Sequence, residues 1–302
     1  MPSTSRYHAF PALRPGDPVA VIAPSSPFDR ASFEAGLAII SRRYQVHYDP
    51  GVLRRRRYLA GSDERRLSEL KSALGDAGAR AIFCARGGYG MMRLLPALEG
   101  IAVVPKPVIG FSDITVLHQL LQRQRLVSIH GPVLTQLSRL DAGAHARLFE
   151  LLESKAPAAA LIGAETYVAG VAEGPLLGGN LSVLTRLLGT PFLAPLDGAI
   201  LLLEDVGERP YRLDRMWTHL ALAGVFRRVR GIVLGELVGC EDKDADYSSA
   251  DVLRELAAAT ALPCAAGFPI GHGAQNQPLP LGVRVRLDAG SCRLTFLEAA
   301  AG

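Results

Sequence analysis

The chain has 302 residues, enough for two domains that each bury a hydrophobic core. Hydrophobic residues make up 49% of it and charged residues 21%, which excludes a disordered or fibrous protein. The formal net charge is only +4, and much of the excess comes from the arginine run 54–57. Because no aromatic ladder or nucleic-acid-binding motif accompanies that run, we interpret it as a solvated loop rim and expect no nucleic-acid partner.

The sequence carries no signal for a membrane or a metal. The N-terminus lacks a basic and then apolar leader, and no stretch approaches ~18 apolar residues. The four cysteines are scattered without C-x-x-C spacing, and Cys84 and Cys292 lie in apolar, strand-like runs. The histidines show no H-x-x-x-H pair with a third ligand nearby. We therefore expect a cytoplasmic protein with reduced cysteines, no metal site and no membrane partner.

In the first half of the chain, short apolar runs alternate with amphipathic segments. The patterns predict strands at 19–23, 44–48, 81–85 and 107–110, and helices around 33–40, over 65–74, after 115 and over 144–152. This alternation predicts an α/β domain over residues 1–152 with a doubly wound parallel sheet. The loops 24–27, 86–90 and 111–113 follow strands, so they should meet at the edge of the sheet where ligands bind.

Ser112 stands where a predicted strand stops and a helix begins. A sharp turn at such a junction can expose a nucleophile beside the N–H groups of the helix start. The alternative is a serine N-cap, which is common. The hydrolase signature G-x-S-x-G is not met, because Ile114 replaces its second glycine. Asp113 and Thr115 are predicted to cap the first turn of the helix.

The stretch Arg86-Gly87-Gly88-Tyr89-Gly90 follows the third predicted strand. Paired glycines let a backbone approach a ligand closely, so the stretch could cradle a phosphate or complete an oxyanion hole. A plain tight turn is the alternative. The stretch is not G-x-G-x-x-G and no Walker lysine follows it, so we expect no nucleotide and no other cofactor.

The second half of the chain has a different pattern of predicted elements. Residues 153–169 are predicted to be a crossover linker, and residues 170–302 a mixed α/β domain. The glycine-rich stretch 174–180 is predicted to be a loop that opens a helix. The remaining predicted elements are the helix 181–188, strand 199–203, helix 209–222, strand 231–237, helix 251–258, and an antiparallel pair at 283–287 and 292–296.

Two polar residues of this half lie in unusual settings. Glu204 ends an apolar run, so it either emerges at a sheet edge or is half buried with a partner. His272 is flanked by two glycines, which strengthens the case for a ring that faces a cleft, although a lone histidine is usually an ordinary surface or core residue. The other histidines lack such a context, and His118 and His130 are the next candidates for a base in the first domain.

Five stretches occur in one order along the chain. They are Ala85-Arg86-Gly87-Gly88-Tyr89-Gly90, Gly110-Phe111-Ser112-Asp113, Gly174-Pro175-Leu176-Leu177-Gly178-Gly179-Asn180, Leu203-Glu204-Asp205-Val206 with Pro210-Tyr211-Arg212-Leu213-Asp214-Arg215, and Gly271-His272-Gly273. With them the sequence resembles the LD-carboxypeptidases, the murein tetrapeptide carboxypeptidases of bacterial cell-wall recycling. The resemblance covers nearly the whole chain, and the ordered set is far more specific than any single motif.

The resemblance implies a Ser-His-Glu peptidase with its active site between a flavodoxin-like or glutamine-amidotransferase-like N-terminal domain and the C-terminal domain. Carried over by position, Ser112 is the nucleophile, His272 the general base and Glu204 the acid that orients it. The implied reaction removes the terminal D-alanine of a murein tetrapeptide from the L-centre of a diamino acid, either diaminopimelate or lysine. No cofactor is implied.

The same chemistry requires an oxyanion hole and cations for the substrate. The N–H groups of Asp113 and Gly88 are assigned to the oxyanion hole, although the sequence alone does not separate Gly88 from Gly87. Arg86 and Arg212 are candidates to bind substrate carboxylates. The sequence leaves open whether the chain forms a homodimer.

Two other functions compete with this one. The microcin-immunity branch of the same family has the same triad but cleaves an aminoacyl-nucleotide amide, for which an aromatic platform between the domains is expected. The only tryptophan, Trp217, lies inside a predicted helix, so the murein substrate is favoured. A non-catalytic ligand-binding module would not require Ser112, Glu204 and His272 together.

Overall fold

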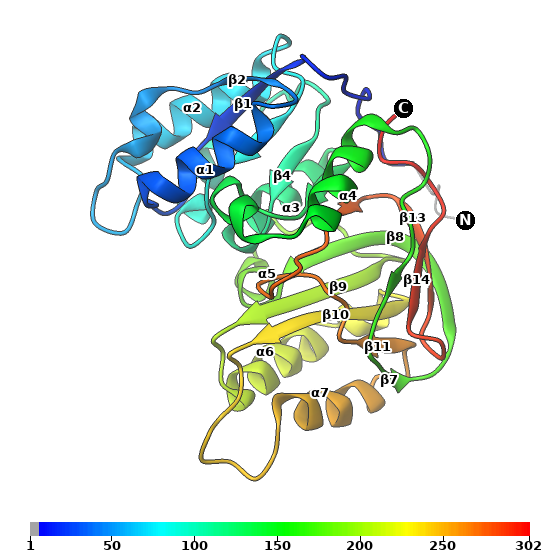
Figure 1. Cartoon of the computed structure of the whole chain (residues 1–302). Helices are drawn as coiled ribbons and strands as arrows, with labels where there is room; N and C mark the ends of the chain where they lie inside the picture. The colour runs from blue at the N-terminus through cyan, green and yellow to red at the C-terminus, as the bar shows by residue number, and fades with distance from the viewer. Residues whose placement is uncertain (1–5) are drawn as a thin grey trace.

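The computed structural model describes residues 6–302 and contains two β-sheets, drawn one above the other in Figure 1. The first sheet has six strands in the order β12-β5-β4-β3-β1-β2. They are β1 (Pro18–Ile22), β2 (Gln45–His47), β3 (Ile82–Cys84), β4 (Val108–Gly110), β5 (Ser128–His130) and β12 (Leu279–Leu281). The first five are parallel, and β12 pairs antiparallel with β5 at the edge.

Helices cover both faces of this sheet, as a doubly wound fold requires. They are α1 (Arg30–Ile40), α2 (Asp63–Gly75), α3 (Thr115–Arg123) and α4 (Ala142–Glu153), with the 3₁₀ turns η1 (Pro50–Leu53), η2 (Met91–Leu98), η3 (Ser112–Ile114) and η4 (Leu134–Arg139) in the connections. Along β3, Phe83 packs into the apolar cluster that contains α1 and α4, whereas Ile82 and Cys84 pack into the cluster that contains α2 and α3. The parallel sheet expected from the sequence is confirmed.

The second sheet has eight strands in the order β6-β14-β13-β8-β9-β10-β11-β7 and is mixed and curled (Figure 1). The strands are β6 (Leu161–Ile162), β7 (Glu165–Val168), β8 (Val171–Asn180), β9 (Ile200–Val206), β10 (Gly231–Val238), β11 (Cys264–Ala266), β13 (Arg284–Asp288) and β14 (Arg293–Phe296). The four strands from β8 to β11 are parallel, and the flanking strands are antiparallel. The predicted C-terminal antiparallel pair is confirmed as β13 and β14.

The second half also contributes three helices, α5 (Leu181–Leu187), α6 (Pro210–Leu222) and α7 (Ser249–Ala258), with the turn η5 (Val225–Arg227) after α6. The helices α6 and α7 lie on the side of the second sheet away from the first sheet (Figure 1). The helix α5 lies between the two sheets, where Leu187 packs into the cluster that contains Leu117 of α3. Trp217 of α6 is 2% exposed and packs against Phe226, with ring centroids 4.7 Å apart. It belongs to the outer core of this domain and not to a ligand platform.

The glycine-rich stretch that the sequence predicts to be a loop is a strand, β8. It lies between β13 and β9, so close to its neighbours that a Cβ added at Gly174 would come within 2.1 Å of the Gly198 oxygen, and one at Gly178 within 2.1 Å of the Leu202 oxygen. Glycine and proline are ordinarily signals of turns, which explains the wrong prediction. Here the glycines permit close backbone packing inside a sheet.

The boundary between the two halves also differs from the sequence prediction. The segment 153–169, predicted to be a linker, contains β6 and β7, which close the two edges of the second sheet. In the other direction, β12 leaves the C-terminal half and completes the first sheet. One buried apolar cluster joins Ile129 of β5, Leu279 of β12 and Leu287 of β13. The two halves therefore share a core that holds them against each other.

Candidate active site

Ser112 occupies the sharp turn between β4 and α3. Its backbone φ is 63°, in the left-handed region that residues with a side chain rarely adopt. A turn of this kind lifts a nucleophile out of the path of the chain. A Cβ added at Gly87 would lie 2.9 Å from Ser112 Cβ and 3.2 Å from its Oγ. The elbow thus places the Ser112 hydroxyl against the glycine loop 86–90.

The side chains after Ser112 do not cap α3, so that prediction is wrong. Asp113 Oδ2 accepts the Met91 N–H at 2.9 Å, and Thr115 Oγ1 accepts the Asn180 N–H at 3.0 Å. The reason is that the η3 turn comes before α3, and both side chains reach other parts of the fold. Asp113 ties the elbow to η2, and Thr115 ties it to β8 of the second sheet.

Glu204 and His272 form a hydrogen-bonded pair. Nδ1 of His272 lies 2.7 Å from Oε2 of Glu204, which is fully buried in β9, while the His272 side chain is 18% exposed. Gly271 permits this approach: its φ is +113°, and a Cβ added there would lie 2.5 Å from Glu204 Oε2. With its proton on Nδ1, the ring donates to the carboxylate and keeps Nε2 as an acceptor.

Asn180 and Asp205 form a polar support beside Glu204. Asn180 Nδ2 donates to Glu204 Oε1 at 3.2 Å and to Asp205 Oδ1 at 3.1 Å. The Asp205 carboxylate also accepts the N–H groups of Ser182 and Val206, each at 2.8 Å. Burial raises the pKa of Asp205 to about 6, against the effect of these donors. The sequence placed both residues in motifs, but it did not show that they meet.

The loop that carries His272 is fastened to the first domain through Asn276. The fully buried Asn276 side chain accepts the Gly271 N–H at 3.0 Å and donates to Gln136 Oε1 at 2.8 Å. Gln136 belongs to η4, 140 positions earlier in the chain. The placement of His272 relative to Ser112 therefore depends on a contact that no local sequence pattern could reveal.

Residues of both domains line one cavity of about 510 Å³. Its wall contains Ser112 and His272 together with Gly87 and Gly88, so the structure brings the predicted nucleophile, base and oxyanion loop to one place. Asp205 lies on the same wall. The cavity opens at the carboxyl ends of the parallel strands β3 and β4, where the sequence analysis placed it.

The arginines that line the cavity are not the two that the sequence suggested. Arg86 lines the cavity and donates to the Pro27 carbonyl at 2.8 Å. Arg212 does not line it; it lies on the first turn of α6 and pairs with Glu208 at 3.3 Å. Arg139, at the end of η4, lines the cavity instead. Sequence reasoning missed Arg139 because nothing in its neighbourhood marks a site.

Within residues 6–302, no group of three or more His, Cys, Asp or Glu side chains is placed to hold a metal ion. In the same residues, no helix has the length and apolar character that crossing a membrane requires. The residues that line the cavity include Ser112, His272 and Asp205, the glycines Gly87 and Gly88, and the arginines Arg86 and Arg139.

Comparison with known proteins agrees with this arrangement. Residues 19–131 match the model of the LD-carboxypeptidase N-terminal domain, and residues 173–287 match that of the LD-carboxypeptidase C-terminal domain. A murein tetrapeptide carboxypeptidase of Pseudomonas aeruginosa is 38% identical over 294 residues, covering 91% of this chain and 94% of the relative. The microcin C7 self-immunity protein of Escherichia coli is 27% identical over 283 residues, covering 80% of each chain.

A solved structure shows the same fold. The crystal structure of muramoyltetrapeptide carboxypeptidase from Oxalobacter formigenes superimposes with a TM-score of 0.81 at 28% identity, covering 92% of this chain and 97% of that one. The arrangement of a mostly parallel N-terminal sheet and a mixed, curled C-terminal sheet is thus shared over almost the entire length.

Proposed function

Because the chain belongs to the LD-carboxypeptidase family, we propose that it is a serine carboxypeptidase that removes the terminal D-alanine from a murein tetrapeptide, a reaction of peptidoglycan recycling. The observation that carries the proposal is the 2.7 Å hydrogen bond between buried Glu204 and His272, on the wall of the cavity that Ser112 also lines. A hydroxyl, an imidazole and a carboxylate in this relation form the catalytic set of a serine peptidase.

In the proposed reaction, Ser112 Oγ attacks the carbonyl carbon that joins the diamino acid to D-alanine, and its proton passes to Nε2 of His272. Glu204 holds the imidazole in the required tautomer and stabilises the imidazolium that forms. The C–N bond then breaks, His272 gives the proton to the leaving amine, and an acyl-enzyme remains on Ser112. Water, deprotonated by His272, releases the tripeptide and restores the hydroxyl.

The developing oxyanion is assigned to the N–H groups of Asp113 and Gly88. Asp113 begins the turn after the elbow, where N–H groups lack partners within the helix. The Tyr89 N–H donates to Ser26 Oγ, so it is already engaged. Removing one such donor typically raises the barrier by roughly 3–4 kcal/mol.

We assign the carboxylates of the substrate to Arg86 and Arg139. Both guanidinium groups lie on the wall of the cavity, and guanidinium groups bind carboxylates in a bidentate manner. A murein tetrapeptide has one carboxylate at its terminal D-alanine and, with diaminopimelate in third position, another on that side chain. The position of Arg212 outside the cavity removes it from this assignment.

The nucleotide substrate of the microcin-immunity branch is the less favoured alternative. The aromatic side chains on the cavity wall are those of Phe28 and Phe111. Phe28 stacks on Phe33, and Phe111 packs against His272 at 4.6 Å between ring centroids. Both rings are engaged by the protein, and Trp217 lies on the far side of the second sheet. A stacking platform for a base is therefore not among these side chains.

The decisive experiment incubates the purified protein with a muropeptide tetrapeptide and measures D-alanine and tripeptide by mass spectrometry. We expect stoichiometric release of D-alanine. We expect Ser112→Ala to reduce the rate by roughly 10⁴–10⁶-fold and Glu204→Gln by roughly 10³–10⁴-fold, because both act in one catalytic unit.

An aminoacyl sulfamoyl adenosine serves as the competing substrate in the same assay, and cleavage of its aminoacyl amide is measured. Cleavage of that compound with no release of D-alanine from the tetrapeptide would replace the murein proposal by the microcin-immunity one. Full activity of a folded Ser112→Ala protein would refute both.

A further inference from the structure

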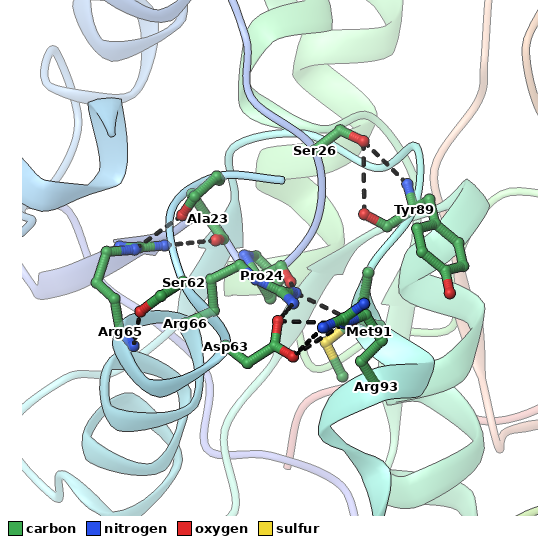
Figure 2. A network of polar contacts seen from close by, with 12 residues as sticks. Ala23, Pro24, Ser26, Ser62, Asp63, Arg65, Arg66, Tyr89, Met91 and Arg93 are labelled. Carbon is green, nitrogen blue, oxygen red and sulfur yellow. Dashed lines mark hydrogen bonds and ion pairs between the residues drawn. The ribbon is translucent and has the colours of Figure 1, made fainter. Parts of the chain in front are cut away.

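Two loops beside the elbow, residues 24–27 and 86–90, are tied together at several points (Figure 2). At one end, Arg66 Nη1 donates to the carbonyls of Pro24 and Gly90, the latter at 3.0 Å. Arg66 is fully buried and pairs with Asp63 at 2.5 Å. At the other end, Arg86 donates to the Pro27 carbonyl at 2.8 Å. Ser26 lies between these two ties.

Ser26 contacts the glycine loop through both its backbone and its side chain. Its N–H donates to the Gly87 carbonyl at 3.1 Å. Its Oγ accepts the Tyr89 N–H at 3.0 Å and lies 3.4 Å from the Tyr89 carbonyl (Figure 2). Gly88 lies between these contacts at φ +95°, and a Cβ added there would come within 2.4 Å of Ser26 Oγ.

These bonds determine the direction of the Gly88 N–H. The Gly87–Gly88 peptide is trans, so its C=O and N–H point in opposite directions. Because the C=O points at Ser26, the Gly88 N–H points away from Ser26. The next N–H, that of Tyr89, is held on Ser26 Oγ. The two bonds on either side of Gly88 thus leave its peptide little freedom to rotate.

We propose that Ser26 is a positioning residue that aims the Gly88 N–H at the oxyanion formed on attack by Ser112. The inference rests on the proposed function. Ser26 is not part of the cavity wall, whereas Gly88 is, so Ser26 acts through the backbone and not by touching the substrate. Hydrogen-bond donors that are fixed before the reaction stabilise developing charge without having to reorganise. Part of this stabilisation should be lost when removal of the Ser26 hydroxyl lets the loop 86–90 move.

A fluorophosphonate probe tests the proposal without knowledge of the natural substrate. Ser112 Oγ forms a bond to phosphorus, the P–F bond breaks, fluoride leaves, and the serine proton passes to His272, while the phosphoryl oxygen occupies the oxyanion hole. The measurement is the rate of probe attachment at Ser112 as a function of probe concentration, followed by mass spectrometry.

In the Ser26→Ala protein, we expect the maximal labelling rate to fall by about 10-fold or more. This decrease should be smaller than the roughly 10²–10³-fold loss of rate that follows complete removal of an oxyanion-hole donor. We expect the half-saturating probe concentration to stay within about twofold, since the cavity wall is unchanged. A partly buried loop serine replaced by the smaller alanine should leave the fold intact, which circular dichroism checks. The matched control is Ser248→Ala at the start of α7. This substitution removes the hydrogen bond that the Asp251 N–H donates to Ser248 Oγ at 3.1 Å.

The outcomes separate the two proposals. Failure of the unchanged protein to be labelled at Ser112 would overturn the serine mechanism itself. Labelling of the unchanged protein and of Ser26→Ala at the same maximal rate would overturn the role of Ser26 and leave the mechanism standing. An equal decrease of the maximal labelling rate in Ser26→Ala and in Ser248→Ala would show a general loss of stability. That result would also overturn the role proposed for Ser26. Slowing in Ser26→Ala alone supports it.

Discussion

At the scale of single residues, three histidines near the elbow show how burial separates chemical roles. His272 is partly exposed and paired with Glu204. His118 is fully buried, with its Nδ1 on Ser128 Oγ at 2.9 Å and its Nε2 on the Gly110 carbonyl at 2.8 Å. His130 is also fully buried, and within residues 6–302 its ring nitrogens have no hydrogen-bond partner. Neither of them lines the cavity, which supports the proposal that His272 is the base.

The buried histidines predict a stability that depends on pH. Burial lowers the pKa of His118 from 6.5 to about 4, so the unfolded chain binds a proton between these values while the folded chain does not. The free energy of unfolding contributed by this site therefore decreases as the pH falls from 6.5 towards 4. His118→Gln should lower the free energy of unfolding at pH 7.5. At pH 4.5 the difference in this free energy between the variant and the unchanged protein should be smaller by about 2–3 kcal/mol.

Urea unfolding of both proteins at the two pH values measures that difference. The control is His47→Gln, which removes a histidine at an exposed position of β2. A His118→Gln deficit that does not depend on pH would show that the ring is protonated alike in the folded and unfolded states.

At the scale of elements, β8 is the strand that docks the second sheet onto the elbow. Its last residue, Asn180, donates its N–H to Thr115 of α3 and its side-chain amide to Glu204 of β9. The preceding Gly179 has φ +140°, and a Cβ there would lie 2.6 Å from Thr115 Oγ1. A side chain at this position would push the sheet that carries Glu204 away from the helix that follows Ser112.

Gly179→Ala should therefore reduce stability and activity together. We expect a loss of about 1–3 kcal/mol from backbone strain and overpacking, and a fall in turnover larger than the loss of folded protein explains. The matched control is Gly189→Ala, where φ is +77° and an added Cβ meets nothing within 4 Å. Thermal denaturation and turnover of the two variants make the comparison. Equal turnover in both would show that close contact between β8 and α3 is not needed for catalysis.

At the scale of the whole molecule, the two domains interlock. The strand β12 is delivered by the C-terminal half to the first sheet, and its residues Leu279 and Leu281 are fully buried in a cluster that also contains Leu287 of the second sheet. Interfaces between domains of one chain are often small and polar. A shared apolar core is firmer, and the proposed triad, divided between two domains, would require that firmness because small displacements impair proton transfer.

We therefore expect the chain to unfold in one cooperative transition. Trp217, the single tryptophan, reports on the outer core of the second domain, and circular dichroism reports on the whole chain. The two signals should change together on heating. Leu279→Ala should lower the stability seen by both probes by about 2–5 kcal/mol, although the residue lies in the first sheet.

The control for this comparison is Leu222→Ala at the end of α6, where the side chain is 80% exposed and its loss should change little. Two separate transitions, with the fluorescence of Trp217 unaffected by Leu279→Ala, would show that the domains fold independently.

Three features could be predicted from the amino-acid sequence alone: the alternation of strands and helices in the first half, the turn at Ser112, and the ordered motifs that carry Glu204 and His272. These are local signals, because a period of two or 3.6 residues and a turn between a strand and a helix are written in neighbouring residues. The same local signals gave a wrong prediction for the glycine-rich stretch 174–180, which is part of β8 and not a loop. The close packing that its glycines permit involves partners that are distant in sequence.

Which side chains meet could be seen only in the folded chain. It paired Glu204 with His272 across 68 positions, placed Arg139 on the cavity wall and Arg212 outside it, and joined Asn276 to Gln136. It also carried β12 into the first sheet. The physical reason is common to all of these: contacts between segments far apart in the chain depend on how whole sheets pack, and no period along the sequence records them.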